Sequence, residues 1–178
     1  SKKLNITQTK EIDILRKIVD ITNSEPDLKL ILNEVVKVVN EATKADSVFI
    51  YLFDEHHKNL VLMASKTPHQ KELGNITLKA GEGITGWVAK ENKPVDIGKN
   101  AYKDKRFKGF DVLPEDRYEA FLSIPVIYKT KVIGVVNVQH KKPHEYALTT
   151  KNLIGLIAKQ IGGVITNARL YEETKTKA

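Results

Sequence analysis

Apolar side chains recur every three or four residues in three segments of the chain, and this spacing predicts three long helices. The first covers residues 11–22, the second follows Asp27, and the third runs from about 149 to 173. We interpret Ser24 and Asp27 as a capping pair for the second helix, with Pro26 in its first turn, where a missing N–H is harmless.

Between the helices lie short apolar or alternating segments that are typical of strands. They read SVFIYLFD, NLVLMASK, NITLKA, FLSIPVIY and VIGVVNVQ. The last two are separated by KTK, a link too short for anything but an antiparallel hairpin. A short helix is expected over residues 84–92, and residues 98–118 form a long irregular loop. Loops of that length usually cover a functional site.

The last hairpin predicts a sheet with two unlike faces. We expect a three-residue loop, with Tyr128 opposite Val132 and Ile127 opposite Ile133. One face is then wholly apolar and suits helix packing. It carries Leu122, Ile124, Val126, Gly134, Val136 and Val138. The other face gathers polar groups at one end of an apolar surface. It carries Phe121, Ser123, Pro125, Ile127, Ile133, Val135, Asn137 and Gln139.

Strand 47–53 divides in the same way, with aliphatic residues on one side and Ser47, Phe49, Tyr51 and Phe53 on the other. An apolar wall with a few convergent polar groups is how small-molecule pockets are lined. Alternatively, the polar side chains satisfy the backbone of the covering loop. A bulge near Pro125 would exchange the two faces.

Gly81, Gly83 and Gly86 form the pattern G-x-G-x-x-G, which in some proteins cradles a dinucleotide. The strand before it is short and polar, the helix after it is brief, and Glu82 would repel a pyrophosphate. We therefore interpret the glycines as backbone devices that allow positive φ or close packing.

Composition indicates one soluble domain of 178 residues, and the serine at position 1 suggests a piece excised from a longer protein. The net charge of +7 comes from scattered lysines, so no nucleic-acid partner is expected. No segment is long and apolar enough for a membrane span, and none resembles a signal peptide. The absence of cysteine excludes thiolate chemistry and fits a cytoplasmic setting.

Catalytic and metal-binding chemistry finds little support. We interpret the histidines of the polar turn, His56 and His57, and those flanking Pro143, His140 and His144, as surface residues rather than metal ligands. Acidic residues occur as adjacent pairs in turns, where they rarely converge on one substrate. We expect no catalytic residue, no metal and no cofactor, and therefore not an enzyme.

Several motifs occur together in a fixed order: LKAGEGITGWVAKENKPVDI, then DKRF, then FLSIPVIYKTKVIGVVNVQ, then a long closing helix. From about Asp20 to Tyr171 the chain resembles the GAF domain family. The pattern is most similar to the GAF domains of nitrogen-related phosphotransferase enzymes, and similar domains occur in sensor histidine kinases and nitrogen-fixation-type transcription activators. Departures argue against other branches, because the chain lacks cysteine and the N-K…F…D-E signature of cyclic-nucleotide binders.

The resemblance implies an α+β fold, with a central antiparallel sheet of five to six strands. Terminal helices cover one face, and a short helix and long loop close a pocket on the other. The ligand would be a cytosolic metabolite such as glutamine or 2-oxoglutarate. The residues that we expect to bind it are Phe49, Tyr51, Trp87, Arg106, Phe107, Arg117, Tyr118, Phe121, Ser123, Asn137 and Gln139.

Some of these roles have alternatives. Arg106 could instead pair with Asp104 or Asp111 to order the loop, while Phe107 and Phe110 anchor it. Trp87 is either a core residue or a lid over the pocket.

The closing helix has 3,4-spaced apolar residues, and with the first helix it predicts a parallel helical-bundle homodimer. The expected interface residues are Ile14, Ile18, Ile21, Ile157, Ile161, Val164, Ala168 and Tyr171. We divide the chain into a linker helix (1–23), the GAF domain (24–173) and a tail (174–178). An output domain of the same polypeptide would read the shift of the helices. A dimerisation module without a ligand is the alternative function.

Overall fold

The computed structural model describes residues 2–66, 74, 76–107 and 117–177, the side chains of 2–9 and 175–177 excepted. The helices are α1 (Lys2–Ser24), α2 (Leu28–Thr43), α3 (Gly83–Glu91) and α4 (Leu148–Lys177). The strands are β1 (Ser47–Phe53), β2 (Asn59–Ser65), β3 (Thr77–Lys79), β4 (Val95–Ile97), β5 (Ala120–Tyr128) and β6 (Lys131–His140).

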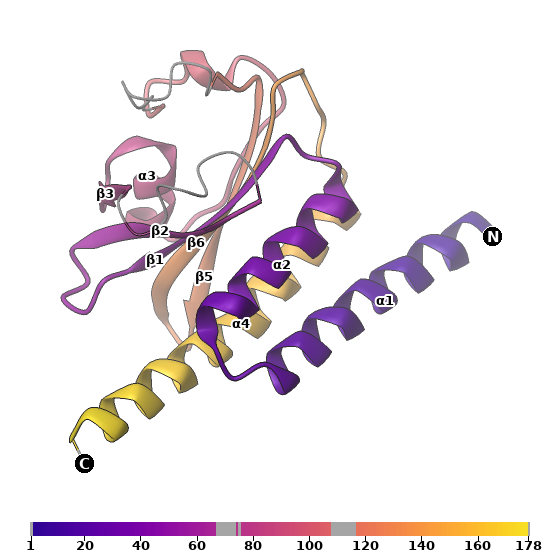
Figure 1. Cartoon of the computed structure of the whole chain (residues 1–178). Coiled ribbons are helices and arrows are strands. Elements are labelled where there is room, and N and C mark those ends of the chain that lie inside the picture. The colour runs from indigo at the N-terminus through magenta and orange to yellow at the C-terminus, as the bar shows by residue number, and fades with distance from the viewer. Residues whose placement is uncertain (1, 67–73, 75, 108–116, 178) are drawn as a thin grey trace.

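The strands form one antiparallel sheet in the order β3-β2-β1-β6-β5-β4 (Figure 1). The predicted β5–β6 hairpin lies beside a second hairpin, β1–β2, because β1 pairs with β6. Sequence reasoning did not identify β4, whose three residues pair with β5 at the edge of the sheet. The α+β class and the six-stranded antiparallel sheet agree with the expectation.

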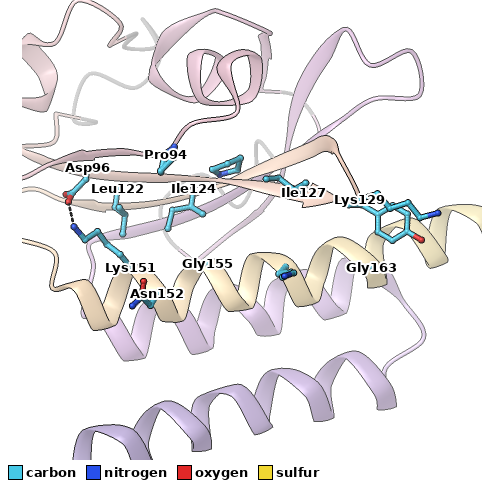
Figure 2. A pocket seen from close by; sticks show the side chains of 13 residues that line it. Pro94, Asp96, Leu122, Ile124, Ile127, Lys129, Lys151, Asn152, Gly155 and Gly163 are labelled. Atoms are coloured by element: carbon cyan, nitrogen blue, oxygen red, sulfur yellow. Dashed lines mark hydrogen bonds and ion pairs between the residues drawn. The ribbon is translucent and has the colours of Figure 1, made fainter. Parts of the chain in front are cut away.

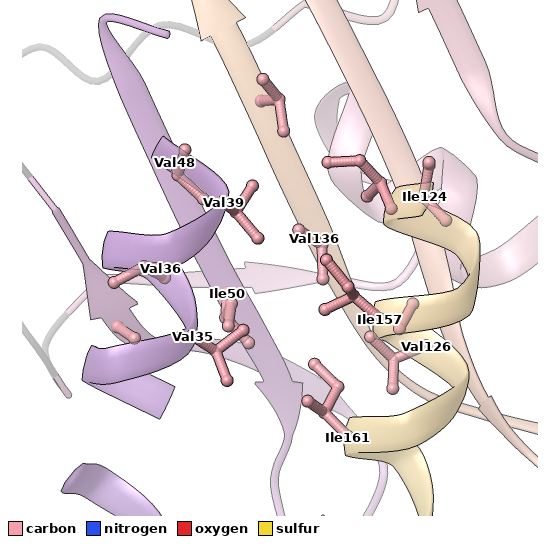
Figure 3. Packing of buried hydrophobic residues seen from close by; sticks show 14 of the residues in the cluster. Val35, Val36, Val39, Val48, Ile50, Ile124, Val126, Val136, Ile157 and Ile161 are labelled. Carbon is pink, nitrogen blue, oxygen red and sulfur yellow. The ribbon is translucent and has the colours of Figure 1, made fainter. Parts of the chain in front are cut away.

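One side of the sheet, the helix face, carries the main core. Its aliphatic side chains, such as Val48, Ile50 and Val136, meet Val35 of α2 and Ile157 of α4 (Figure 3). Helix α2 contacts β1 and β2, and α4 contacts β5 and β6. Helix α1 lies outside these two helices and contacts both (Figure 1). Burying apolar surface in this way is the dominant stabilising term of such a domain.

The junction of α1 and α2 differs from the prediction. Helix α1 begins at Lys2 and continues through Ser24, so Ser24 does not cap α2. Asp27 alone occupies the N-cap, and its carboxylate accepts a hydrogen bond from the backbone N–H of Lys29 at 2.9 Å. Pro26 precedes the helix, and an N-cap side chain of this kind stabilises a helix by about 1 kcal/mol.

The register of the β5–β6 hairpin is as expected up to Val126, which lies opposite Gly134. Beyond it a bulge intervenes, and Ile127 pairs with Val132 rather than with Ile133. The connection is thus shorter than the expected three residues, with Lys129 at φ 58°. The bulge moves Ile133 to the helix face. Because the bulge lies between the polar residues and the hairpin turn, the polar residues keep their predicted face.

Candidate functional site

The second side of the sheet, the front face, carries the candidate site. Aromatic residues of β1 and β5, including Phe49, Tyr51 and Phe121, form a second buried cluster with Ile84 and Val88 of α3. Helix α3 therefore covers the front face as expected. The first part of the long loop also lies here, since Ala101 is buried in the same cluster. The backbone N–H of Ala101 donates to the carbonyl of Glu119 at 2.9 Å.

The glycine motif acts as a backbone device. Gly81 and Gly83 have φ of 89° and 70°, a region that other residues rarely adopt. A Cβ atom at Gly86 would lie 2.5 Å from the carbonyl oxygen of Lys79. The N–H groups of Gly81, Glu82 and Gly86 donate to backbone carbonyls of the same turn. These donors are therefore not directed at a phosphate, and the conformational interpretation is confirmed.

Three polar side chains form a hydrogen-bonded chain between the sheet and α3. The Ser123 hydroxyl donates to Asn137 Oδ1 at 2.7 Å, and Asn137 Nδ2 donates to Thr85 Oγ1 at 2.8 Å. All three residues are buried. The sequence analysis missed Thr85, whose only signal was a hydroxyl on the inner side of a short helix. Among the described residues, Ser123 and Asn137 thus satisfy each other and α3 rather than the backbone of the loop.

Gln139 differs from its neighbours. It lies two residues along β6 from Asn137 and on the same face, with Ser47 of β1 opposite it on one side and Phe121 of β5 on the other. Its side chain is 4% exposed, and its Oε1 atom has no hydrogen-bond partner among the residues that the structure describes. A buried acceptor left in this state costs about 1–3 kcal/mol. An incoming hydrogen-bond donor would recover that free energy, which makes Gln139 the feature of this face most suited to a ligand.

Tyr118 and Ser47 close the same end of the front face. Their hydroxyls are 2.5 Å apart, and both side chains are buried. Tyr118 was expected to bind a ligand directly; the structure places its hydroxyl against Ser47 beside Gln139.

The loop arginines have partners of their own. Arg106 forms a bidentate ion pair with Asp104, with Nε–Oδ1 and Nη2–Oδ2 distances of 2.9 and 3.0 Å. These bonds lower the pKa of the Asp104 carboxyl. The guanidinium of Arg106 also lies 4.6 Å from the centre of the Trp87 ring, and the guanidinium of Arg117 lies 3.8 Å from the centre of the Tyr102 ring. Arg106 therefore orders the loop, as the alternative held.

Trp87 and Phe107, two aromatic residues that we expected to bind the ligand, pack against the buried cluster of the front face. Trp87 and Phe107 are both half-buried there. Trp87 thus packs as a core residue at the margin of this cluster, and its role as a lid stays a prediction. Phe110 and Asp111 lie outside the described residues.

The predicted dimer residues have mixed positions. Ile18, Ile157 and Ile161 lie in the core of the single chain, so they are not available to a partner in this structure. Ile14, Ile21 and Val164 pack partly buried against that core. Ala168 is half-buried, and Tyr171 is 71% exposed.

The prediction that His140 is a surface residue was wrong. Its ring is 8% exposed, with Nδ1 at 2.9 Å from the Tyr146 hydroxyl and Nε2 at 3.3 Å from the Thr43 carbonyl. Burial and the neighbouring His144 lower the pKa of His140. His144 itself is exposed and stacks on that ring. Among the described residues, no three histidines or acidic residues cluster in a way that would hold a metal ion.

Comparisons with known proteins agree with this architecture. A phosphoenolpyruvate-dependent phosphotransferase system protein of Escherichia coli K12 is 28% identical over 170 residues, covering 92% of this chain and 23% of the relative. The chain thus spans about a quarter of the length of that curated relative. No helix within the described residues has the length and apolarity needed to span a membrane.

Solved structures show the same fold. The GAF domain of an Acinetobacter phosphoenolpyruvate-protein phosphotransferase superposes with a TM-score of 0.81 at 33% identity, over 92% of this chain and 97% of that one. The corresponding domain from Coxiella burnetii gives 0.85 at 29% identity, over 92% and 96%. The GAF domain model matches residues 27–165, and the chain therefore belongs to the GAF domain family.

Proposed function

We propose that this GAF domain senses a small metabolite at the front face and regulates a larger cytoplasmic signalling protein through its terminal helices. The observation that carries the proposal is the buried Oε1 atom of Gln139, which has no hydrogen-bond partner among the described residues. It lies on the same face of the sheet as an apolar and aromatic cluster and beside a few polar side chains, the usual lining of a small-molecule site. Similarity to phosphotransferase GAF domains supports a regulatory rather than a catalytic role.

The polarity of this atom favours one class of metabolite. A free acceptor needs a ligand that donates a hydrogen bond, such as the amide or ammonium group of an amino acid. At neutral pH 2-oxoglutarate carries only acceptors, so it would leave Gln139 Oε1 unsatisfied. Of the two nitrogen-status metabolites that the family resemblance implied, glutamine therefore suits the site better.

A direct contact joins the front face to the C-terminal helix. Arg169 of α4 donates from Nη2 to the carbonyl oxygen of Phe53 at 2.7 Å. Phe53 is the last residue of β1, and its ring belongs to the front-face cluster. A ligand that shifts the end of β1 would therefore pull on α4. In a dimer, the same displacement would reach the output domain.

Thermal unfolding with a panel of amino acids, 2-oxo acids, nucleotides and inorganic anions tests the proposal. Glutamine at 100 times its dissociation constant should stabilise the fold by about 2.7 kcal/mol. Gln139→Leu should abolish that stabilisation. Gln160→Leu, which alters a glutamine on α4 away from the front face, should keep it. The absence of any ligand-induced shift in the wild-type chain would refute sensing.

The second candidate is a GAF-fold dimerisation module without a ligand. The hydrogen-bonded chain of Ser123, Asn137 and Thr85 favours it, because two of the expected ligand contacts are already satisfied within the protein. In that case the panel produces no shift, and Gln139→Leu only changes the stability of the free domain.

A further inference from the structure

A groove lies on the helix face, between α4 and the strands β4 and β5 (Figure 2). Its volume is about 880 Å³, within the range of sites that hold small molecules. Leu122 and Ile124 of β5 point toward α4 and form an aliphatic floor (Figure 2). Asp96 of β4 lies toward one end of the groove, and Tyr128 lies toward the other. The groove is on the opposite side of the sheet from Gln139, so it is a second site and goes beyond the proposed function.

On the α4 side the groove is bounded by glycines. Gly155 and Gly163 line it, and a Cβ atom at either position would meet no atom of the described residues within 4 Å. Gly162 differs, because a Cβ atom there would lie 2.7 Å from the carbonyl oxygen of Ile127. Packing within the chain therefore requires a glycine at 162 but not at 155 or 163, although glycine is a poor helix former. The space beside Gly155 and Gly163 is thus open to an occupant.

Charge is unevenly distributed along the groove. At one end Lys151 pairs with Asp96, and the Nζ and Oδ2 atoms are 3.0 Å apart (Figure 2). Toward the other end lie Lys159 and Lys129, and neither has an acidic partner in the part of the chain that the structure describes. With three lysines and one aspartate, the lining carries a net charge of +2. It therefore favours an anionic occupant whose charge lies at the Tyr128 end.

We propose that the groove binds an amphipathic monocarboxylate, a medium-chain fatty acid, with its alkyl chain on the aliphatic floor and its carboxylate beside Lys159. Leu122 and Ile124 suit an alkyl chain, because the burial of each methylene group is favourable and needs no directed contact. The ammonium group of a lysine holds a carboxylate by charge-assisted hydrogen bonds. The distribution of charge sets the direction of the ligand: its chain extends from Lys159 toward the neutral pair of Asp96 and Lys151.

The length of the groove selects the length of the chain. Lys159 and Lys151 are separated along α4 by about 12 Å, at 1.5 Å per residue. With C–C bonds of about 1.5 Å in a zigzag, an extended chain of about ten carbon atoms covers this distance. A longer acid would extend past the ion pair into solvent. Nucleotides and dicarboxylates fit less well, since a second charged group would lie on the aliphatic floor.

Titration calorimetry of the chain with straight-chain acids tests the proposal. From hexanoate to decanoate the dissociation constant should fall about fourfold per methylene group, and it should level off for longer acids. Octan-1-ol has the length of octanoate without its charge and should bind about tenfold more weakly. Equal affinity for octanoate and octan-1-ol would overturn the proposal, and so would a groove that binds an acidic peptide but none of the acids.

A second experiment fills the groove. Gly155→Leu with Gly163→Leu places two side chains in open space and replaces poor helix formers with a good one, so the melting temperature should not fall. This variant should raise the dissociation constant for decanoate at least about thirtyfold, the factor that the loss of two to three buried methylene contacts represents. Lys37→Leu, on the exposed surface of α2, should bind decanoate like the wild type. Undiminished binding by the filled variant would exclude this groove.

The direction of the ligand is tested by removing one charge. Lys159→Gln should weaken decanoate binding about tenfold and leave octan-1-ol binding unchanged, whereas Lys37→Gln should affect neither ligand. An equal loss for both ligands in Lys159→Gln would overturn the contact between Lys159 and the carboxylate. Gln139→Leu should bind decanoate normally, and the groove-filled variant should keep its thermal shift with glutamine. The two sites can therefore stand or fail separately.

Discussion

The two faces of the sheet are built from the same strands and differ in what remains unsatisfied. On the helix face, branched aliphatic side chains of β1, β5 and β6 interlock with α2 and α4. On the front face, aromatic rings surround polar groups, and one acceptor has no partner among the described residues. Apolar packing on the helix face stabilises the fold, whereas the buried polar groups of the front face lower the stability of the domain. Proteins commonly concentrate such compromises at functional sites.

The largest expected effect concerns the helix face. Ile161→Ala removes a fully buried side chain and should lower the free energy of unfolding by about 2–5 kcal/mol, since the cavity cannot close around it. Urea denaturation measures this loss. Leu30→Ala, at a position 49% exposed on α2, should change the free energy of unfolding by less than about 0.5 kcal/mol. Equal losses in the two variants would contradict the location of the core.

The polar chain of the front face comes next. Asn137→Leu leaves the buried hydroxyls of Ser123 and Thr85 without their shared partner, which should cost about 2 kcal/mol of unfolding free energy. Ser123→Ala removes only the terminal hydroxyl and should cost about 1 kcal/mol. If Asn137→Leu proves neutral in the same denaturation assay, the three side chains do not stabilise the contact between α3 and the sheet.

The neighbouring Gln139 should respond with the opposite sign. Gln139→Leu removes a buried acceptor that has no partner in the described part of the chain and keeps most of the volume, so the free domain should gain about 1 kcal/mol. The measurement is the same urea midpoint in the absence of metabolites. A loss as large as that of Asn137→Leu would mean that the amide oxygen is satisfied in the free protein, and the two polar residues would no longer differ.

The smallest effect concerns the buried His140 of the helix face. Because its pKa is lowered in the fold from 6.5, the unfolded chain takes up the proton first as the pH falls. The stabilisation is complete above pH 6.5 and declines as the pH falls through the folded pKa. Melting temperatures of the wild type and His140→Phe between pH 7.5 and about 5 should therefore diverge. Parallel curves would exclude His140 as the source of the pH dependence. The control variant His144→Gln should follow the wild type.

Local patterns predicted most of the fold because they depend on neighbouring residues. The alternation in FLSIPVIY and VIGVVNVQ correctly assigned Asn137 and Gln139 to one face and Val136 and Val138 to the other. The bulge after Val126 escaped prediction, since a turn can close with two or three residues at similar free energy. The burial of His140 escaped as well, because Tyr146 and Thr43 reach it from other elements.

The sequence by itself determined the two-faced sheet, the helices and the family, since side-chain direction along a strand or helix repeats with a period of two or 3.6 residues. Only the tertiary structure decided which polar groups meet. Thr85 satisfies Asn137 across 52 positions of the chain, and Gln139 lacks such a partner among the described residues. The groove beside Gly155 and Gly163 also arises from packing. Such contacts depend on distances between distant segments, which no local pattern contains.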